Sequence, residues 1–173
     1  MTFLNCKSMG NKGVGATSYG FSCTGSSLHS MRFENCSAIN NKGDSDAYGF
    51  YSESLEYSYF DQCVANNQRT TSVSSVTVAG FYSKGGEGLT FKNCIAFGNK
   101  GNANVSDKAI GFCLDAYSGS GEMYSNIIGC QAKDNDGGTG TGYGIYLVSA
   151  TACTIQKNEL FVNHGITGGY GIK

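Results

Sequence analysis

The segment FENCSAINN at residues 33–41 recurs as FKNCIAFGN at residues 91–99, and this repetition decides the fold. The spacing occurs six times: an aromatic residue or Ile, then Cys or Asn three positions on, then Asn or Gln after five more. The first position holds Phe3, Phe33, Phe60, Phe91, Ile127 and Ile155. The second holds Cys6, Cys36, Cys63, Cys94, Cys130 and Asn158, and the third holds Asn11, Asn41, Gln68, Asn99, Asn135 and Asn163. A mean period of about 30 residues is typical of a solenoid.

A second motif, Tyr-Gly-Phe or a close variant, follows each copy of the first and always has glycine at its centre. These glycines are Gly20, Gly49, Gly80, Gly111, Gly144 and Gly171. In the second copy, Tyr48 and Phe50 alternate with Gly49 and Tyr51, which is the period of a β-strand. We therefore expect Tyr48 and Phe50 to point inward, and the glycines and the following tyrosines to point outward.

The alternation breaks between Phe33 and Cys36, so the chain must bend at Glu34–Asn35 to keep both side chains inside. Each repeat then supplies about three short strands and three corners, and each strand finds partners only in the neighbouring repeats. Strands stacked in this way lie roughly 4.8 Å apart. The prediction is an all-β solenoid of about six rungs of roughly 30 residues, forming one domain over residues 1–173 without clear terminal caps.

The Asn-Cys-x-Ala-x-x-Asn and Tyr-Gly-Phe motifs resemble the repeats of the pectate-lyase-like superfamily. The resemblance covers essentially the whole chain and implies a right-handed single-stranded parallel β-helix. That fold is shared by polysaccharide lyases and hydrolases, phage tailspikes and bacterial adhesins, so it specifies shape much better than activity. The proline-containing arginine motif of pectate lyases is missing, since the chain has no proline and only Arg32 and Arg69 as arginines.

The repeated residues have structural explanations. Stacked aromatic and aliphatic columns form a core, and the Asn column is similar to the amide ladder of the superfamily, in which each side chain bonds to the next rung. Five of the eight cysteines share one inward column, where we expect free, buried thiols, because stacked parallel side chains are poorly placed for disulfides. Cys23, Cys113 and Cys153 lie outside this column, and Cys113 is the best candidate for an outward, reactive thiol. With only His29 and His164 as histidines, no metal site or cofactor is expected.

Two outward columns carry charge. Lys12, Lys42, Arg69 and Lys100 directly follow the Asn column and would stack as four like charges, a stripe that either extends into water or binds an anion. An acidic glycan, a nucleic-acid backbone or the carboxylates of a partner would fit such a stripe.

The second charged column is an alternating ladder of Glu53, Lys84 and Asp115. Glu53 and Asp115 would lie roughly 9–10 Å apart, near the carboxylate separation of inverting glycosidases. Lys84 between them favours a structural ladder over a catalytic pair, because a cation lowers both carboxyl pKa values. Tyr51, Tyr82 and Tyr146 run beside the glycine column and would suit sugar stacking or subunit packing.

Composition narrows the function further. With 12 basic and 13 acidic residues the net charge is −1, so no global field attracts nucleic acid, and no apolar run is long enough to cross a bilayer. We expect a non-enzymatic structural or adhesive solenoid on a cell surface, appendage or virion, whose open ends indicate either end-to-end self-assembly or a piece of a longer solenoid. The alternative is a carbohydrate-active enzyme or glycan-binding module that uses the tyrosines with Glu53, Lys84 and Asp115.

Overall fold

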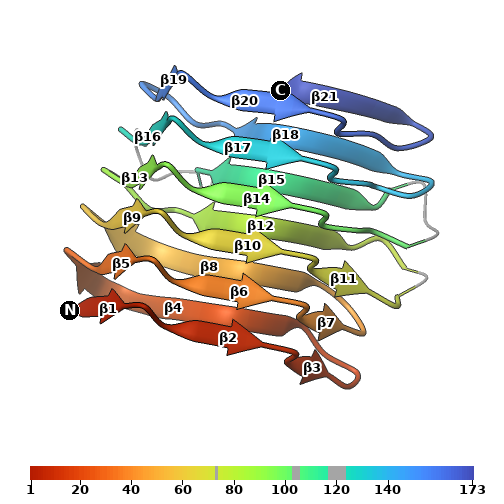
Figure 1. Cartoon of the computed structure of the whole chain (residues 1–173), viewed down its shortest axis with the longest axis horizontal. Helices are drawn as coiled ribbons and strands as arrows, with labels where there is room; N and C mark the ends of the chain where they lie inside the picture. Colours follow the sequence, from red (N-terminus) through yellow and green to blue (C-terminus); the bar gives the residue numbers. More distant parts are fainter. Residues whose placement is uncertain (73, 103–105, 117–123) are drawn as a thin grey trace.

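The computed structural model describes residues 1–72, 74–102, 106–116 and 124–173. In these ranges the chain is all β, and equivalent strands of successive repeats pair in parallel to form four sheets. Figure 1 shows the repeats as the levels of one stack, with the N-terminal turn at one end and the C-terminal turn at the other. The predicted parallel β-solenoid is confirmed. Its right-handed sense and its membership in the pectate-lyase-like superfamily stay predictions.

Two six-stranded sheets carry the first motif. The first sheet consists of β1 (Thr2–Leu4), β5 (Arg32–Glu34), β9 (Tyr59–Asp61), β13 (Thr90–Lys92), β16 (Asn126–Ile128) and β19 (Thr154–Gln156). The second consists of β2 (Lys7–Met9), β6 (Ser37–Ile39), β10 (Val64–Asn66), β14 (Ile95–Phe97), β17 (Gln131–Lys133) and β20 (Glu159–Phe161). Phe3 pairs with Phe33 and Phe33 with Phe60, so the aromatic anchors lie in one column, as the spacing predicts.

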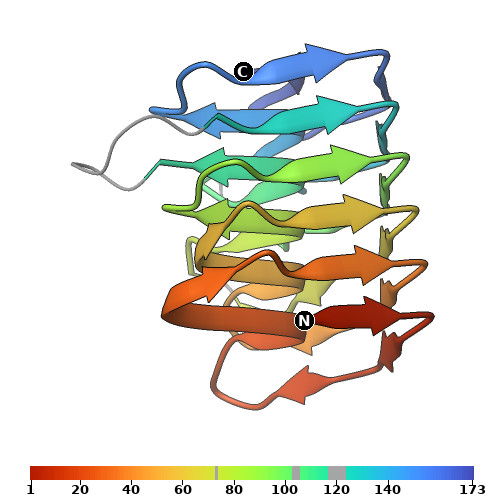
Figure 2. The ribbon, with the colours of Figure 1, turned by 90° about the vertical axis from the view of Figure 1, so that its left-hand side faces the viewer.

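The other two sheets complete the turns, the small one in the first three turns alone (Figure 2). A small sheet consists of β3 (Lys12–Gly13), β7 (Lys42–Gly43) and β11 (Arg69–Thr70). The widest sheet consists of β4 (Ser18–His29), β8 (Ala47–Glu56), β12 (Thr77–Lys84), β15 (Lys108–Asp115), β18 (Thr141–Val148) and β21 (Gly168–Ile172). In this last sheet Phe50 pairs with Phe81 and Phe81 with Phe112, so the second motif also stacks in register.

Left-handed residues form the corners between the first two sheets and after the second. Asn35 has a φ of 51°, which places the predicted bend at Glu34–Asn35. The corner after the second sheet uses Asn40 and Asn67, with φ of 55° each, and glycines at Gly10 and Gly98. Asn and Gly are the residues that adopt this conformation at least cost, which explains their repetition in the sequence.

Two ladders of phenylalanine rings fill the interior. Phe33 and Phe60 stack with centroids 4.8 Å apart in one ladder, and Phe50 and Phe81 do the same in the other. Edges of one ladder meet faces of the other, as between Phe60 and Phe81 at 6.3 Å. Offset stacks and edge-to-face pairs are the favoured geometries for aromatic rings, so the two columns stabilise each other.

The amide ladder is also confirmed. Asn41 Nδ2 donates to Gln68 Oε1 at 2.8 Å, and Asn99 Nδ2 donates to Asn135 Oδ1 at 2.8 Å. Gln68 connects to the following rung differently, since its backbone N–H donates to Asn99 Oδ1 at 3.2 Å. These four side chains are fully buried, so the ladder satisfies polar groups that would otherwise be costly inside the core.

The expected direction of the central glycines is wrong. A Cβ built on Gly49 would lie 2.8 Å from Ala65 Cβ and 3.3 Å from Gln68 Nε2, so Gly49 faces inward. Phe50 also packs in the main core, whereas Tyr48 packs outside with Tyr51, contrary to the expectation that Tyr48 points inward. Two consecutive inward residues break the alternation, because only a residue without a side chain fits against the alanine column and the amide ladder.

Candidate functional site

The basic stripe exists as predicted. Lys12 pairs with Lys42 and Lys42 with Arg69 in the small sheet, and Arg69 forms an isolated bridge with Lys100. All four residues are exposed. Consecutive cations therefore follow one another along the axis of the solenoid at the strand spacing of roughly 4.8 Å.

One acidic residue, Asp136, follows the last cation of the stripe. The column continues with Asp136, whose carboxylate oxygens lie 3.4 Å from Lys100 Nζ and 3.6 Å from His164 Nε2. Lys100 is therefore partly neutralised. Within the described ranges, the cationic groups of the other three stripe residues have no carboxylate oxygen within 4.0 Å; these are Lys12, Lys42 and Arg69.

One more carboxylate lies near this group. Asp44 accepts hydrogen bonds from Gly15 N at 2.9 Å and from Thr71 Oγ1 at 2.7 Å. These bonds, with a smaller contribution from the charges of Lys12 and Lys42, lower the pKa of Asp44. Asp44 is thus an ionised neighbour whose oxygens are already hydrogen-bonded, and it reduces the net positive charge of the stripe without covering it.

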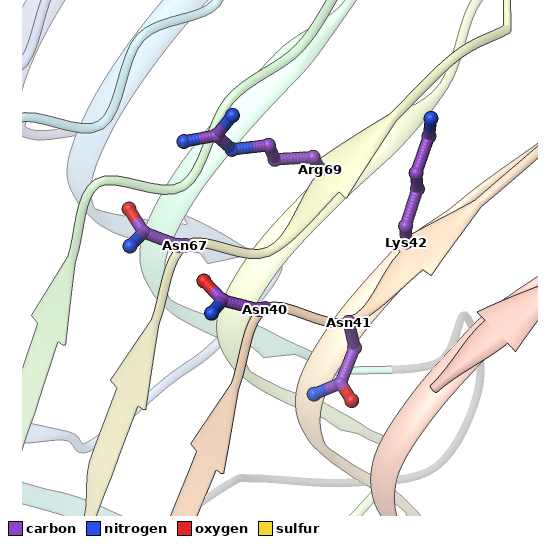
Figure 3. A pocket seen from close by; sticks show the side chains of 5 residues that line it. All are labelled: Asn40, Asn41, Lys42, Asn67 and Arg69. Carbon is purple, nitrogen blue, oxygen red and sulfur yellow. The ribbon is translucent and has the colours of Figure 1, made fainter. Parts of the chain in front are cut away.

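A hollow of about 310 Å³ lies beside the stripe, lined by Asn40, Asn41, Lys42, Asn67 and Arg69 (Figure 3). Asn40 and Asn67 occupy the left-handed corner on neighbouring rungs, so their amides project side by side. Arg69 extends above Asn67, whereas Lys42 stands apart at the other side. Asn41 belongs to the buried amide ladder and also lines the hollow.

A glycine on the next rung leaves room for one of these amides. The corner after Asn67 is Gly98, and a Cβ there would lie 2.6 Å from Asn67 Oδ1. The Asn67 amide therefore uses space that only glycine leaves open, with its oxygen against Gly98 and its Nδ2 turned away from it. The sequence predicted the cations of this site but not the amides of Asn40 and Asn67. The adjacent asparagines Asn40-Asn41 and Asn66-Asn67 were the signal that could have indicated them.

The alternating ladder on the widest sheet is confirmed as a column, since Lys84 pairs with both Glu53 and Asp115. Lys84 Nζ lies 3.0 Å from Glu53 Oε1, and Tyr51 donates to Glu53 Oε2 at 3.2 Å. The hydrogen bond from Lys84 lowers the pKa of Glu53, so Glu53 is ionised at neutral pH. A catalytic acid needs the opposite shift. Asp115 accepts a hydrogen bond from the Tyr82 hydroxyl at 2.7 Å.

The outward tyrosines form a layer of their own. Tyr51 and Tyr82 stack with centroids 5.8 Å apart and an interplanar angle of 17°, so one face of each ring is turned to the other. Burial raises the pKa of both hydroxyls, that of Tyr51 to about 12. Lys108 Nζ lies 5.2 Å from the centre of the Tyr146 ring. Rings that pack on each other in this way have less free face for a sugar than the sequence suggested.

All eight cysteines are free, which includes the five of the inward column for which free thiols were predicted. The inward column is buried from Cys36 to Cys130, and Cys94 Sγ donates to Lys92 O at 3.3 Å. Cys113 lies on the outer face in the same column as Tyr82 and Tyr146, but it is only 2% exposed. Burial raises the pKa of its thiol. The expected reactivity of Cys113 is therefore wrong, because the tyrosine layer covers it.

A titratable cluster at another corner was not predicted. Glu56 and Glu87 are bridge partners on neighbouring rungs; His29 Nδ1 lies 2.9 Å from Glu56 Oε2, and the Tyr57 hydroxyl donates to Glu87. Both glutamates come six residues after the Phe of the second motif, which is the signal that could have revealed them. The contacts join three rungs at an exposed corner.

The predicted site residues thus fall into two groups on different sheets. One group is the basic stripe, of which two residues line the hollow; it consists of Lys12, Lys42, Arg69 and Lys100. The other group lies on the outer face of the widest sheet and consists of Glu53, Lys84, Asp115, Tyr51, Tyr82 and Tyr146. Among the described residues, no three His, Cys, Asp or Glu side chains gather as a metal site. No helix there is long and apolar enough to traverse a membrane. No protein-family model matches the chain, and no similar sequence is found among curated proteins.

Proposed function

We propose that this chain is a non-catalytic structural and adhesive solenoid that acts on a cell surface, appendage or virion. The observation that carries this proposal is the continuity of its columns: core rings, amides and outward charges each pair with the next rung. Such a rod presents rows of stacked groups over several turns, which suits repeated contacts with a surface better than chemistry at one point.

The carboxylates favour binding over catalysis. Glu53 is ion-paired with Lys84, and its lowered pKa opposes the role of a proton donor. A reducing-sugar assay on a panel of polysaccharides tests this point, and we expect no release above background. Release that disappears in Glu53→Gln or Asp115→Asn would contradict the proposal and favour a glycoside hydrolase.

Self-association is part of the proposal. β1 and β19 are the outer strands of the first sheet, and β21 and β4 are those of the widest sheet, so their outer edges lack a strand partner among the described residues. The last turn also exposes Ile172, at 52%, in the column of Ile145. Unpaired strand edges and apolar column ends both favour the addition of a further turn or of a second copy.

Sedimentation velocity and negative-stain imaging of the 173-residue chain test the stacking. We expect rods that lengthen with concentration, and we expect Ile172→Lys to shorten them by placing a charge at the stacking face. Ile39→Lys is the matched control, because Ile39 lies on β6 within the stack and outside the interior cluster. A strictly monomeric chain at high concentration would refute self-assembly and leave the adhesive role to be judged by the binding experiment below.

A further inference from the structure

We propose that the hollow beside the basic stripe binds a tetrahedral ester oxyanion, a sulfate or a phosphate, carried by a sugar polymer. This inference names the ligand class of the adhesive role proposed above and rests on it. It comes from residues that line one hollow: two cations from the small sheet and two amides from the corner before it.

The donors of the site favour an anion. Arg69 offers a planar fork of N–H groups, Lys42 an ammonium, and Asn40 and Asn67 amide N–H groups. Because the cationic groups of Lys42 and Arg69 lack a carboxylate oxygen within 4.0 Å in the described part of the chain, their donors remain available to a ligand. Like charges on adjacent rungs repel, and an anion placed between them removes that repulsion.

The number of donors favours a tetrahedral anion over a carboxylate. A guanidinium fork satisfies both oxygens of a planar carboxylate and would leave the amides and the ammonium without a role. An ester sulfate or phosphate has three terminal oxygens. Two can meet the fork of Arg69, and the third can meet Lys42 or an amide of the corner.

The size of the hollow and its surroundings favour a polymer over a free ion. A volume of about 310 Å³ exceeds what a small anion fills and matches the lower range of pockets that hold small organic ligands. Lys12 continues the stripe on the rung before Lys42, so a second anionic group on the same polymer meets a second cation. Asn40 and Asn67 can also accept hydrogen bonds from sugar hydroxyls through their Oδ1 atoms.

Binding of dextran sulfate, dextran phosphate and uncharged dextran, measured by isothermal titration calorimetry, tests the proposal. We expect both charged polymers to bind and the uncharged one not to bind, and the tighter of the two identifies the ester. The variant Arg69→Gln with Lys42→Gln should weaken binding about tenfold or more, because two charge-assisted contacts are lost.

The matched control is Lys7→Gln with Lys92→Gln, which changes the net charge equally but on β2 and β13, at exposed positions outside the hollow. We expect its affinity to stay within about twofold of the parent chain. If this control weakens binding as much as the site variant, the attraction is a general charge effect and the proposed site is wrong.

A second variant separates the hollow from the charges. Asn40→Gly with Asn67→Gly removes both amides while keeping residues that accept a φ of 55°. We expect about a threefold to tenfold loss of affinity with an unchanged salt dependence. Unchanged affinity in this variant, or tighter binding of single-stranded DNA than of either charged dextran, would overturn the proposal. Circular dichroism of each variant confirms that the sheet content is kept.

Rod formation and polymer binding depend on different surfaces of the chain, so the failure of one can be distinguished from the failure of the other. The assembly-blocking Ile172→Lys variant should bind charged dextran with the affinity per chain of the parent, since Ile172 lies in β21 and not in the hollow. If the parent chain binds charged dextran but does not form rods, self-assembly alone is refuted, and if it forms rods but does not bind charged dextran, the oxyanion site alone is refuted.

Discussion

The substitution Gly111→Ala would test the inward direction of the glycine column. A Cβ on Gly111 would lie 2.5 Å from Gly144 O, 2.6 Å from Ala132 Cβ and 3.2 Å from Asn135 Nδ2. Two of these neighbours are a backbone carbonyl and a Cβ, which cannot move without shifting a strand. The third belongs to the buried amide ladder, whose Asn135 Nδ2 donates to Asn163 at 2.7 Å.

The magnitude follows from two opposing effects. Overpacking of a close-packed interior costs about 1–3 kcal/mol, and contacts this short place Gly111→Ala near the upper value. Replacing Gly by Ala also restricts the unfolded chain, which returns up to about 1 kcal/mol. A net loss of about 2 kcal/mol corresponds to a fall in Tm of roughly 4–8 °C for a chain of this size.

Thermal and urea unfolding followed by circular dichroism measure this loss, with Gly171→Ala as the control. Gly171 occupies the same column in the last turn, where a Cβ would meet only Leu160 Cβ at 3.8 Å and Leu160 Cδ1 at 3.9 Å. These are ordinary contacts, so its Tm should be unchanged or slightly raised. If Gly111→Ala proves as harmless as Gly171→Ala, the glycines do not pack against the alanine column and the account of the interior is wrong.

Three further predictions concern the ladders and the thiols. Gln68→Leu should lower the free energy of unfolding in urea by about 1–3 kcal/mol, because it leaves buried partners of the amide ladder unsatisfied. A loss smaller than that caused by an exposed Gln→Leu change would argue against the ladder. Lys84→Met should raise the pKa of Glu53 toward its ordinary value in a carboxyl NMR titration, and an unmoved pKa would show that the ion pair is absent in solution. The stability that Glu53 contributes is present above the ordinary carboxyl pKa and lost as the pH falls through the lowered one. In native alkylation with mass spectrometry, Cys6 should react before Cys113, and the opposite order would contradict the burial of the outer thiol.

The sequence predicted what depends on stacking alone. Like residues must lie over like in a solenoid, so Phe33 over Phe60 and the basic stripe followed directly from the period. The bend at Asn35 followed from broken alternation. These features depend on spacing within one repeat, which a single sequence displays six times.

The inward or outward directions of the residues in the second motif could not be predicted in the same way. Strict alternation put Gly49 outside, but the chain turns Gly49 and Phe50 inward together and leaves Tyr48 outside. The reason is a contact between columns, the fit of glycine against Ala65, and the period says nothing about which columns face each other. The repeated alanine of the first motif was the signal, since two columns of small residues can approach closely.

The basic stripe differs in kind from the other columns. The phenylalanines, amides and glycines each occupy places where stacking itself requires their size or hydrogen bonds, and the alternating ladder of Glu53 and Lys84 pairs opposite charges. The stripe gains nothing from stacking, because cations on adjacent rungs repel. Its neighbouring hollow is shaped by the same corner that the fold needs, but two of the corners carry an asparagine amide, whereas the equivalent positions in other turns hold Gly10, Gly98, Asp134 and Val162. The residues that stacking does not require are therefore those in which a binding function is to be sought.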